Sequence, residues 1–307
     1  MRILAADFGG TTIKFGLVEN DRVLVEDRMP AKSGEPLAPR LSVLQSHLEE
    51  LCGRASLSTE EIDGLAFAFP SLLNRERTRI TSAPEKYSDA TDIDWMHWSR
   101  DAMGCPLVLE NDVVSALLGE WKFGAGRGSD HLLMLKLGTG VGSAVVQDGR
   151  VLRGSHGAAG VLGGHLTIKV DGDPCYCGNV GCVETEASTW TVQDQMGDEV
   201  DLAWLFDGDD PDRQFLRDQV LRGWGAALVN LVHAYDPARV VVGGGPMGSR
   251  EQILPALRSY VDQHAWRPRT ADALPIVLGD LGDRAPFLGL TWRFEKDAPP
   301  TTTNEQI

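Results

Sequence analysis

The hydrophobic and polar positions of the chain form short apolar runs and longer segments with helical spacing. The runs that predict buried strands lie at residues 2–7, 64–69, 106–109, 239–242 and 274–278. The segments whose apolar spacing predicts helices lie at residues 41–54, 113–122, 187–196, 214–235, 250–264 and 283–294. Strands and helices thus occur in both halves of the chain, which predicts a protein of the α/β class.

Two stretches of the chain carry the same strand-turn-strand pattern. Residues 10–18 and 22–24 correspond to residues 138–146 and 150–152, at a constant offset of 128 residues. In each copy a glycine and threonine turn follows an apolar strand, and its backbone N–H groups and hydroxyls are suited to an anion. In a single hairpin, such glycines could be present only because the tight turn requires their backbone conformation. The repetition favours a phosphate-binding turn in each of two similar α/β domains.

Three connections between the predicted elements differ in character. Gly243-Gly244-Gly245 lies between a strand and a helix, where it allows close approach to a nucleotide, although a plain tight turn explains the spacing equally well. Residues 71–95 lack clear periodicity, and a loop of this length in a compact domain is usually functional. The acidic segment 197–213 is interpreted as a solvated surface excursion, because its carboxylates lack a fixed frame.

Three of the five cysteines lie within eight residues, shortly after a histidine. The spacing H-x9-C-x-C-x4-C is formed by His165, Cys175, Cys177 and Cys182. One imidazole and three thiolates make a soft tetrahedral set that suits a closed, structural zinc site. The alternative to a metal site is a set of buried thiols beside a core histidine. A lone histidine would favour that alternative, whereas three cysteines within eight residues favour the metal.

Length and composition exclude several classes of function. The chain has 307 residues, of which 42% are hydrophobic and 24% charged, and this fits two globular domains. Its formal charge of −15 argues against nucleic acid as a partner and is interpreted mainly as a solubility feature. Because it has no run of membrane-spanning length and no leader pattern, we expect a cytoplasmic protein without membrane contact. The odd cysteine count fits a reducing compartment, with Cys52 and Cys105 as free thiols.

Residues 154–184 resemble the signature of the ROK family, which comprises repressors, open reading frames and sugar kinases. They contain a GAAG segment, a Gly-His pair and the pattern CxCGxxGCxE. The family motif NDxxxAxxGE is matched by Asn111, Asp112, Ala116, Gly119 and Glu120. The resemblance covers nearly the whole chain. It implies two actin-like (RNase H-like) α/β ATPase domains around a central cleft, together with a zinc-binding loop.

The resemblance also implies a division of the chain. The N-terminal domain is expected over residues 1–122, with a C-terminal helix at about residues 283–296 packed back on it. The C-terminal domain is expected over residues 123–282 and carries the zinc loop. Residues 297–307 are interpreted as a polar, disordered tail. The family further implies a homodimer.

Individual roles follow from the matched family motifs. Asp112 would be the catalytic base that accepts the proton of a sugar hydroxyl during transfer of the γ-phosphoryl of ATP, with a helix N-cap as the alternative role. The sugar would contact Asn111, Glu184, Ser71 and His165, the last also a zinc ligand. ATP and its Mg²⁺ would contact the phosphate turns and their neighbours, namely Asp7, Gly9, Gly10, Thr11, Thr12, Lys14, Gly138, Thr139, Gly140, Gly243, Gly244 and Gly245.

The resulting prediction is a zinc-stabilised, ATP- and Mg²⁺-dependent kinase that phosphorylates a hexose, by default at its 6-hydroxyl. Two departures from the family leave the sugar open: Leu162 replaces the glutamate of E-x-G-H, and Val113-Val114 replace an alanine-asparagine pair. A kinase of a polyol or pentose and a non-catalytic, sugar-binding or regulatory protein are the alternatives. Retention of Asp7 and Asp112 favours an enzyme. Because the chain opens directly on a strand, we expect no N-terminal helix-turn-helix and no DNA binding.

Overall fold

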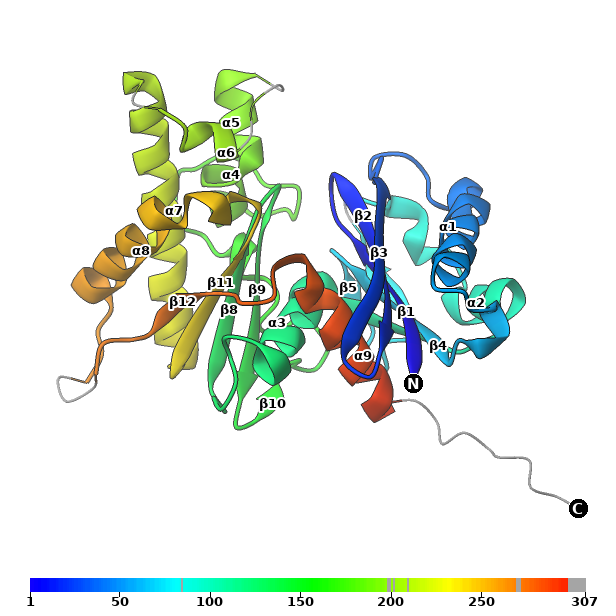
Figure 1. Cartoon of the computed structure of the whole chain (residues 1–307). Helices are drawn as coiled ribbons and strands as arrows, with labels where there is room; N and C mark the ends of the chain where they lie inside the picture. Colours follow the sequence, from blue (N-terminus) through cyan, green and yellow to red (C-terminus); the bar gives the residue numbers. More distant parts are fainter. Residues whose placement is uncertain (84, 198–199, 201, 209, 269–271, 298–307) are drawn as a thin grey trace, which may run out of the picture. The chain divides into compact units, whose positions relative to one another are not determined.

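The computed structural model describes residues 1–83, 85–197, 200, 202–208, 210–268 and 272–297, and Figure 1 labels its elements. The chain divides into two compact units. The first comprises Met1–Gly119 together with the C-terminal residues from Asp283 onward, and the second comprises Glu120–Gly282. The predicted polar tail lies outside the described residues, except for Asp297 at the end of the last helix. None of the helices described is both long and apolar enough to cross a membrane.

A five-stranded sheet forms the centre of the first unit. Its strands are β1 (Arg2–Phe8), β2 (Thr12–Glu19), β3 (Arg22–Pro30), β4 (Gly64–Phe69) and β7 (Leu107–Asn111). They pair in the order β3-β2-β1-β4-β7, with β1, β4 and β7 parallel to one another and the β1-β2 and β2-β3 pairs antiparallel. All six residues of β4 are buried, because an inner parallel strand is covered on both faces.

Helices cover both faces of this sheet. They are α1 (Leu41–Arg54), α2 (Trp95–Met103), α3 (Asp112–Phe123), which runs past the end of the unit at Gly119, and α9 (Ala285–Asp297). Leu65 of β4 belongs to the core formed with α1 and α2, whereas its neighbour Gly64 lies against α9. Side chains alternate along a strand, so α9 covers the face opposite α1 and α2. Shorter elements complete the unit: β5 (Leu72–Leu73), β6 (Ile80–Ser82), η1 (Ala38–Arg40), η2 (Thr59–Glu61) and η3 (Ser88–Thr91).

Two phenylalanines of α9 fit onto the sheet at glycine positions. A Cβ atom on Gly16 would lie 2.7 Å from Cδ2 of Phe287, and one on Gly64 would lie 2.1 Å from Cζ of Phe294. Both distances are too short for any side chain. The glycines therefore make room for rings that come from the far end of the chain, and Figure 1 shows α9, in red, beside the blue strands of this unit.

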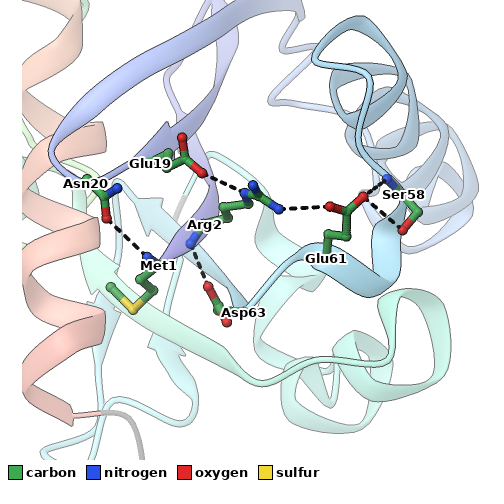
Figure 2. A network of polar contacts seen from close by, with 7 residues as sticks. All are labelled: Met1, Arg2, Glu19, Asn20, Ser58, Glu61 and Asp63. Carbon is green, nitrogen blue, oxygen red and sulfur yellow. Dashed lines mark hydrogen bonds and ion pairs between the residues drawn. The ribbon is translucent and has the colours of Figure 1, made fainter.

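A polar network fixes the start of β1 (Figure 2). The guanidinium of Arg2 donates hydrogen bonds to Glu19 at 2.7 Å and to Glu61 at 2.9 Å, and its backbone N–H donates to Asp63 at 2.6 Å. The N–H of Ser58, followed by the charge of Arg2, lowers the pKa of the Glu61 carboxyl. These contacts join the first strand to the end of β2 and to the turn before β4.

The second unit repeats the strand arrangement of the first. Its strands are β8 (Leu132–Leu137), β9 (Val141–Gln147), β10 (Arg150–Val151), β11 (Arg239–Gly244) and β12 (Ile276–Leu278). Their order is β10-β9-β8-β11-β12, again with an antiparallel trio followed by parallel strands. β3 begins at Arg22 and β10 begins at Arg150, at the offset found in the sequence. The α/β class and the duplicated hairpin are confirmed.

The helices of the second unit differ from the prediction at several places. They are η4 (Gly163–His165), α4 (Val183–Glu186), α5 (Thr189–Met196), α6 (Leu202–Leu205), α7 (Pro211–Tyr235), η5 (Gly245–Ser249) and α8 (Arg250–His264). The single helix expected over residues 187–196 is wrong at its start. The chain breaks at Ser188, whose hydroxyl accepts a hydrogen bond from the N–H of Trp190 at 3.1 Å and so caps α5.

The acidic segment 197–213 is not wholly a solvated excursion. Its apolar residues Leu202, Leu205 and Phe206 are buried in the core of the second unit, and the first two lie on the short helix α6. The prediction was wrong for these residues because the surrounding carboxylates hide their helical spacing. The long helix α7 also begins three residues earlier than expected, at Pro211, where proline suits the first helical position.

The carboxylate of Glu120 ties together two segments at the boundary of the second unit. Its Oε2 accepts hydrogen bonds from the N–H groups of Ala125 at 2.9 Å and Asp280 at 3.0 Å, and its Oε1 accepts one from Leu281 at 2.9 Å. The residue is 1% exposed. A Cβ atom on Gly279 would lie 2.7 Å from Oε1. One buried side chain thus holds the segment just after the chain enters this unit and the segment just before it leaves.

Candidate functional site

Predicted site residues of the first unit gather at one edge of its sheet. Because β1, β4 and β7 are parallel, their carboxyl ends bring Asp7, Ser71 and Asn111 to the same edge. Ligands of open α/β sheets bind at such an edge. Asp7 and Ser71 are 6% and 5% exposed, so both polar side chains are nearly buried there.

Asn111 caps the helix that carries the predicted base. Its Oδ1 accepts hydrogen bonds from the N–H groups of Val113 at 3.0 Å and Val114 at 3.1 Å, and its Nδ2 donates to the backbone oxygen of Ser71 at 3.3 Å. Asp112 is the first residue of α3 and is half-buried. The helix start therefore already has its cap in Asn111. Within the part of the chain that the structure describes, the second N–H of the Asn111 amide has no acceptor.

Glu110 stabilises the segment that carries Asn111 and Asp112. It was not among the predicted site residues. It is fully buried, its Oε1 accepts a hydrogen bond from the N–H of Asn111 at 2.9 Å, and its Oε2 lies 3.9 Å from Nε of Arg293 on α9. A buried carboxylate needs such a counter-charge. The signal in the sequence was a charged residue at the end of an apolar strand.

The turn between β1 and β2 is built by close backbone contacts. The N–H of Gly9 donates to the oxygen of Thr12 at 3.1 Å, and a Cβ atom on Gly9 would lie 2.7 Å from that oxygen. Positive φ is not the reason for glycine here, since neither Gly9 nor Gly10 has one. Tyr87 and Ser33 donate hydroxyl hydrogen bonds to the carbonyls of Gly9 and Gly10, each at 2.7 Å. Neighbouring loops thus hold the turn's carbonyl oxygens.

Thr11 and Lys14, which are also predicted to contact phosphate, differ from each other in their surroundings. Thr11 is exposed at the tip, as a phosphate contact would require. Nζ of Lys14 lies 2.5 Å from Oδ1 of Asp283, so its ammonium group is paired with a carboxylate that precedes α9. A phosphate role for Lys14 would need this pair to open.

The predicted phosphate residues of the second unit also lie together. The turn after β8 is closed by a hydrogen bond from the N–H of Gly138 to the oxygen of Gly140 at 3.0 Å. Gly243 and Gly244, predicted as part of a turn, are the last residues of β11, and Gly245 begins η5. The end of β11 lies beside the turn after β8, because a Cβ atom on Gly244 would be 1.8 Å from the oxygen of Leu137. Gly244 has φ of 111°, which only glycine adopts readily. Both turns therefore stand at the carboxyl ends of adjacent parallel strands.

The cysteine loop brings its four predicted ligands into one cluster. The ligand atoms of His165, Cys175, Cys177 and Cys182 all lie within 4.8 Å of one another. Sγ of Cys175 is 3.6 Å from Nδ1 of His165, and the sulfurs of Cys177 and Cys182 are 3.7 Å apart. A tetrahedron with zinc–sulfur bonds of about 2.3 Å has edges of about 3.8 Å, so the donor set and its spacing fit zinc.

His165 and Glu184, the predicted sugar contacts of the second unit, meet through Tyr176. The hydroxyl of Tyr176 donates to Oε1 of Glu184 at 2.8 Å and lies 3.5 Å from Nε2 of His165. Oε2 of Glu184 accepts from the N–H of Val141 at 3.0 Å. Burial, followed by the charge of Glu184, raises the pKa of Tyr176. Sequence reasoning missed Tyr176, whose signal was its place between two predicted cysteine ligands.

Leu162, which stands where the family pattern has a glutamate, is 40% exposed. It precedes the short helix η4, and η4 ends at His165. An apolar side chain that is partly open to solvent thus lies three residues before a predicted zinc ligand.

Comparison with known proteins places the chain among sugar kinases and repressors. The model of the ROK family matches residues 3–296. A glucokinase of Halalkalibacterium halodurans is 27% identical over 94% of this chain and 93% of its own length. The crystal structure of a ROK hexokinase from Thermus thermophilus has a TM-score of 0.74 and 32% identity, and the match covers 97% of this chain and 100% of that one. The xylose repressor of Bacillus subtilis is 26% identical over 74% of this chain and 60% of its own length.

Proposed function

This chain belongs to the ROK family and is an ATP-dependent sugar kinase with an actin-like α/β fold, and from this premise we propose that it phosphorylates the 6-hydroxyl of a hexose. The observation that carries the proposal is the position of Asp112. Its carboxylate begins α3 at the carboxyl edge of the sheet, where the helix already has its cap in Asn111.

Asp112 performs the proton transfer in the proposed reaction. It orients the sugar hydroxyl and accepts its proton while a bond forms between the hydroxyl oxygen and the γ-phosphorus. The bond from that phosphorus to the β–γ bridging oxygen breaks, and ADP leaves. The remaining N–H of the Asn111 amide holds a neighbouring sugar hydroxyl, which keeps the reacting oxygen in line.

The glycine turns bind the nucleotide in this proposal. In the first unit, Gly9 to Thr12 contact the phosphates, with Lys14 reaching them when its pair with Asp283 opens. In the second unit, Gly138 to Gly140 contact the phosphates and Gly243 to Gly245 contact the adenosine side. Support comes from the place of both second-unit turns at the ends of parallel strands, where α/β sheets bind ligands.

Two metal ions belong to the proposal. Mg²⁺ would be held near Asp7, directly or through water, since a carboxylate oxygen suits this hard cation, and it would neutralise charge on the phosphates. Zn²⁺ would be held by His165, Cys175, Cys177 and Cys182, and it would order the loop that they form. The observation in favour of zinc is the spacing of the four ligand atoms. A homodimer and a cytoplasmic location complete the proposal.

A different function remains in view because of the repressor relatives. The match to the xylose repressor favours a non-catalytic, sugar-binding or regulatory protein, and the pentose in that name favours a pentose kinase. Asp112 distinguishes these candidates, because a binding protein has no need of a base and a pentose kinase retains it.

An ATP-consumption screen tests the proposed function. Purified protein is assayed with Mg²⁺, ATP and a panel of hexoses, N-acetylated hexosamines, pentoses and polyols. Asp112→Asn should reduce turnover of the best substrate by roughly 10²–10⁴-fold, which is the usual loss for a general base. Asp101→Asn, at an exposed position on α2, is the matched control and should retain full turnover. Activity with Asp112→Asn equal to that of the wild type would refute the assignment, and silence across the panel would favour the regulatory protein.

A further inference from the structure

The segment that follows the last cysteine of the zinc loop holds both ends of the turn between β8 and β9. Oε2 of Glu184 accepts a hydrogen bond from the N–H of Val141 at 3.0 Å. The hydroxyl and the N–H of Thr189 donate to the oxygen of Gly138, at 2.9 Å and 3.3 Å. Residues 138–141 are therefore held from two sides by residues 184 and 189.

The carboxylate of Glu184 is enclosed at this place. The residue is 4% exposed. A Cβ atom on Gly140 would lie 2.6 Å from Oε2 of Glu184, and one on Gly164 would lie 3.2 Å from it. The carboxylate therefore fills space that glycines leave on the turn and on the segment before His165, so a shift of Glu184 would move the turn.

Tyr176 fixes the carboxylate from the other side. Its hydroxyl donates to Oε1 of Glu184 at 2.8 Å. Its ring packs edge-on against His165 and against Trp190, the residue after Thr189, with ring centroids 5.3 Å apart in both pairs. Because Tyr176 stands between Cys175 and Cys177, the chain of contacts runs from the cysteine loop through Glu184 to the turn.

The turn held in this way presents donors at its tip. Among the described residues, none accepts a hydrogen bond from the N–H of Thr139 or of Gly140. The carbonyl of Gly138 is engaged by Thr189, and the N–H of Val141 by Glu184. Adjacent N–H groups in a glycine turn, with the carbonyls drawn away, are a typical arrangement for binding an anionic group.

We propose that Tyr176, Glu184 and Thr189 are positioning residues for the nucleotide, which hold residues 138–141 in the shape that binds the phosphates of ATP. The inference rests on the proposed function, because that function assigns this turn to phosphate. It changes the role of Glu184, which acts on ATP through Val141 in addition to any contact with the sugar. The cysteine loop then governs nucleotide affinity.

Nucleotide binding without sugar tests this inference. Isothermal titration of the full chain with Mg²⁺ and the non-hydrolysable analogue AMPPNP gives Kd, and steady-state assays give KM for ATP and for the best sugar. Tyr176→Phe removes one hydroxyl and keeps the ring. It should raise Kd and KM for the nucleotide by about 5- to 30-fold, which is part of the value of a hydrogen bond to a charged group because Tyr176 acts through Glu184. KM for the sugar should change less. Tyr260→Phe on α8 is the matched control and should change neither constant.

Thr189 provides an independent variant outside the cysteine loop. Thr189→Val should weaken AMPPNP binding by about 3- to 10-fold, the scale of a neutral hydrogen bond, and Thr189→Ser should restore it because the hydroxyl is retained. Wild-type nucleotide affinity in both Tyr176→Phe and Thr189→Val, with only KM for the sugar raised, would overturn the inference and leave the kinase intact. A wild-type protein that binds no AMPPNP would overturn the proposed function and this inference together.

Discussion

Nδ2 of Asn111 donates a hydrogen bond to the backbone oxygen of Ser71 across 3.3 Å, which joins the end of β7 to the loop after β4. Ser71 is itself 5% exposed, and no described residue offers its hydroxyl a hydrogen-bond partner. A buried hydroxyl without a partner typically costs about 1–3 kcal/mol. A hydroxyl group of the substrate would relieve this cost, since the loop lies beside the predicted base.

Replacement of Ser71 by alanine should therefore weaken the binding of the sugar without lowering the stability of the fold. We expect Ser71→Ala to raise KM for the sugar by about 3- to 10-fold, the scale of a neutral hydrogen bond, with the free energy of unfolding unchanged or slightly increased. Steady-state kinetics and urea unfolding measure the two effects. Ser99→Ala is the control: that hydroxyl is also in a buried residue but donates to the oxygen of Met96 at 3.2 Å, so its loss should affect stability alone. An unchanged KM for Ser71→Ala would exclude the sugar contact.

Glu120→Gln should destabilise the second unit. The carboxylate accepts three backbone hydrogen bonds, and an amide must turn an NH₂ group toward at least one of those donors. The expected loss in the free energy of unfolding is about 1–3 kcal/mol, read from the urea midpoint at constant m. Glu251→Gln, an exposed position on α8, should change the midpoint little. Equal urea midpoints for both variants would show that the buried carboxylate does not contribute to the stability of the second unit.

Metal analysis of untagged protein should find about one zinc ion per chain, as four ligands in a tetrahedral set require. Cys182→Ser should abolish this content and lower Tm, because zinc binding to such a loop contributes to folding free energy. Cys52→Ala, which lies in the core of the first unit, should retain the metal. Wild-type protein that is folded and free of metal would contradict the assignment.

Stability at alkaline pH should depend on Cys105. Burial raises the pKa of this thiol to about 11. An unfolded cysteine loses its proton near pH 8.5, so between about pH 8.5 and 11 the unfolded state binds fewer protons than the folded state. The free energy of unfolding therefore falls as pH rises through this window. Cys105→Ala should make the fall shallower in urea titrations from pH 7.5 to 10.5, after its constant offset at pH 7.5 is subtracted. If the free energy of unfolding of the variant and the wild type fell in parallel with pH, Cys105 would not be the source of the fall.

The hydrophobic pattern predicted most elements because strands and helices here are long enough to show their periods. Residues 64–69 and 41–54 match β4 and α1 in both bounds. Boundaries failed where a side chain outside the pattern ends an element, as Ser188 does by capping α5. The helix α6 was missed because its buried leucines stand among acidic residues that dominate the composition of the segment.

The candidate site divides in a similar way. The glycine turns and the four predicted zinc ligands lie in short motifs, so the sequence alone was enough to name them as candidates. Tyr176 carries no motif of its own, and its role depends on a hydrogen bond to Glu184. The pair formed by Glu110 and Arg293 joins β7 to α9, two elements whose contact no local pattern encodes. Sequence reasoning therefore named candidate residues that lie in motifs and missed the residues that contact them in the fold.

The placement of α9 has a consequence for synthesis on the ribosome. The face of the first sheet that carries Gly16 and Gly64 receives its covering rings from Phe287 and Phe294, so that face stays open until those residues emerge. The second unit, in contrast, is one continuous segment between Glu120 and Gly282. Domains generally fold as they are made, from the N-terminus onward. Residues 4–109 can already form the core on the α1 and α2 face. The opposite face is covered last, so the nascent chain must keep that apolar face soluble while all of the second unit is synthesised.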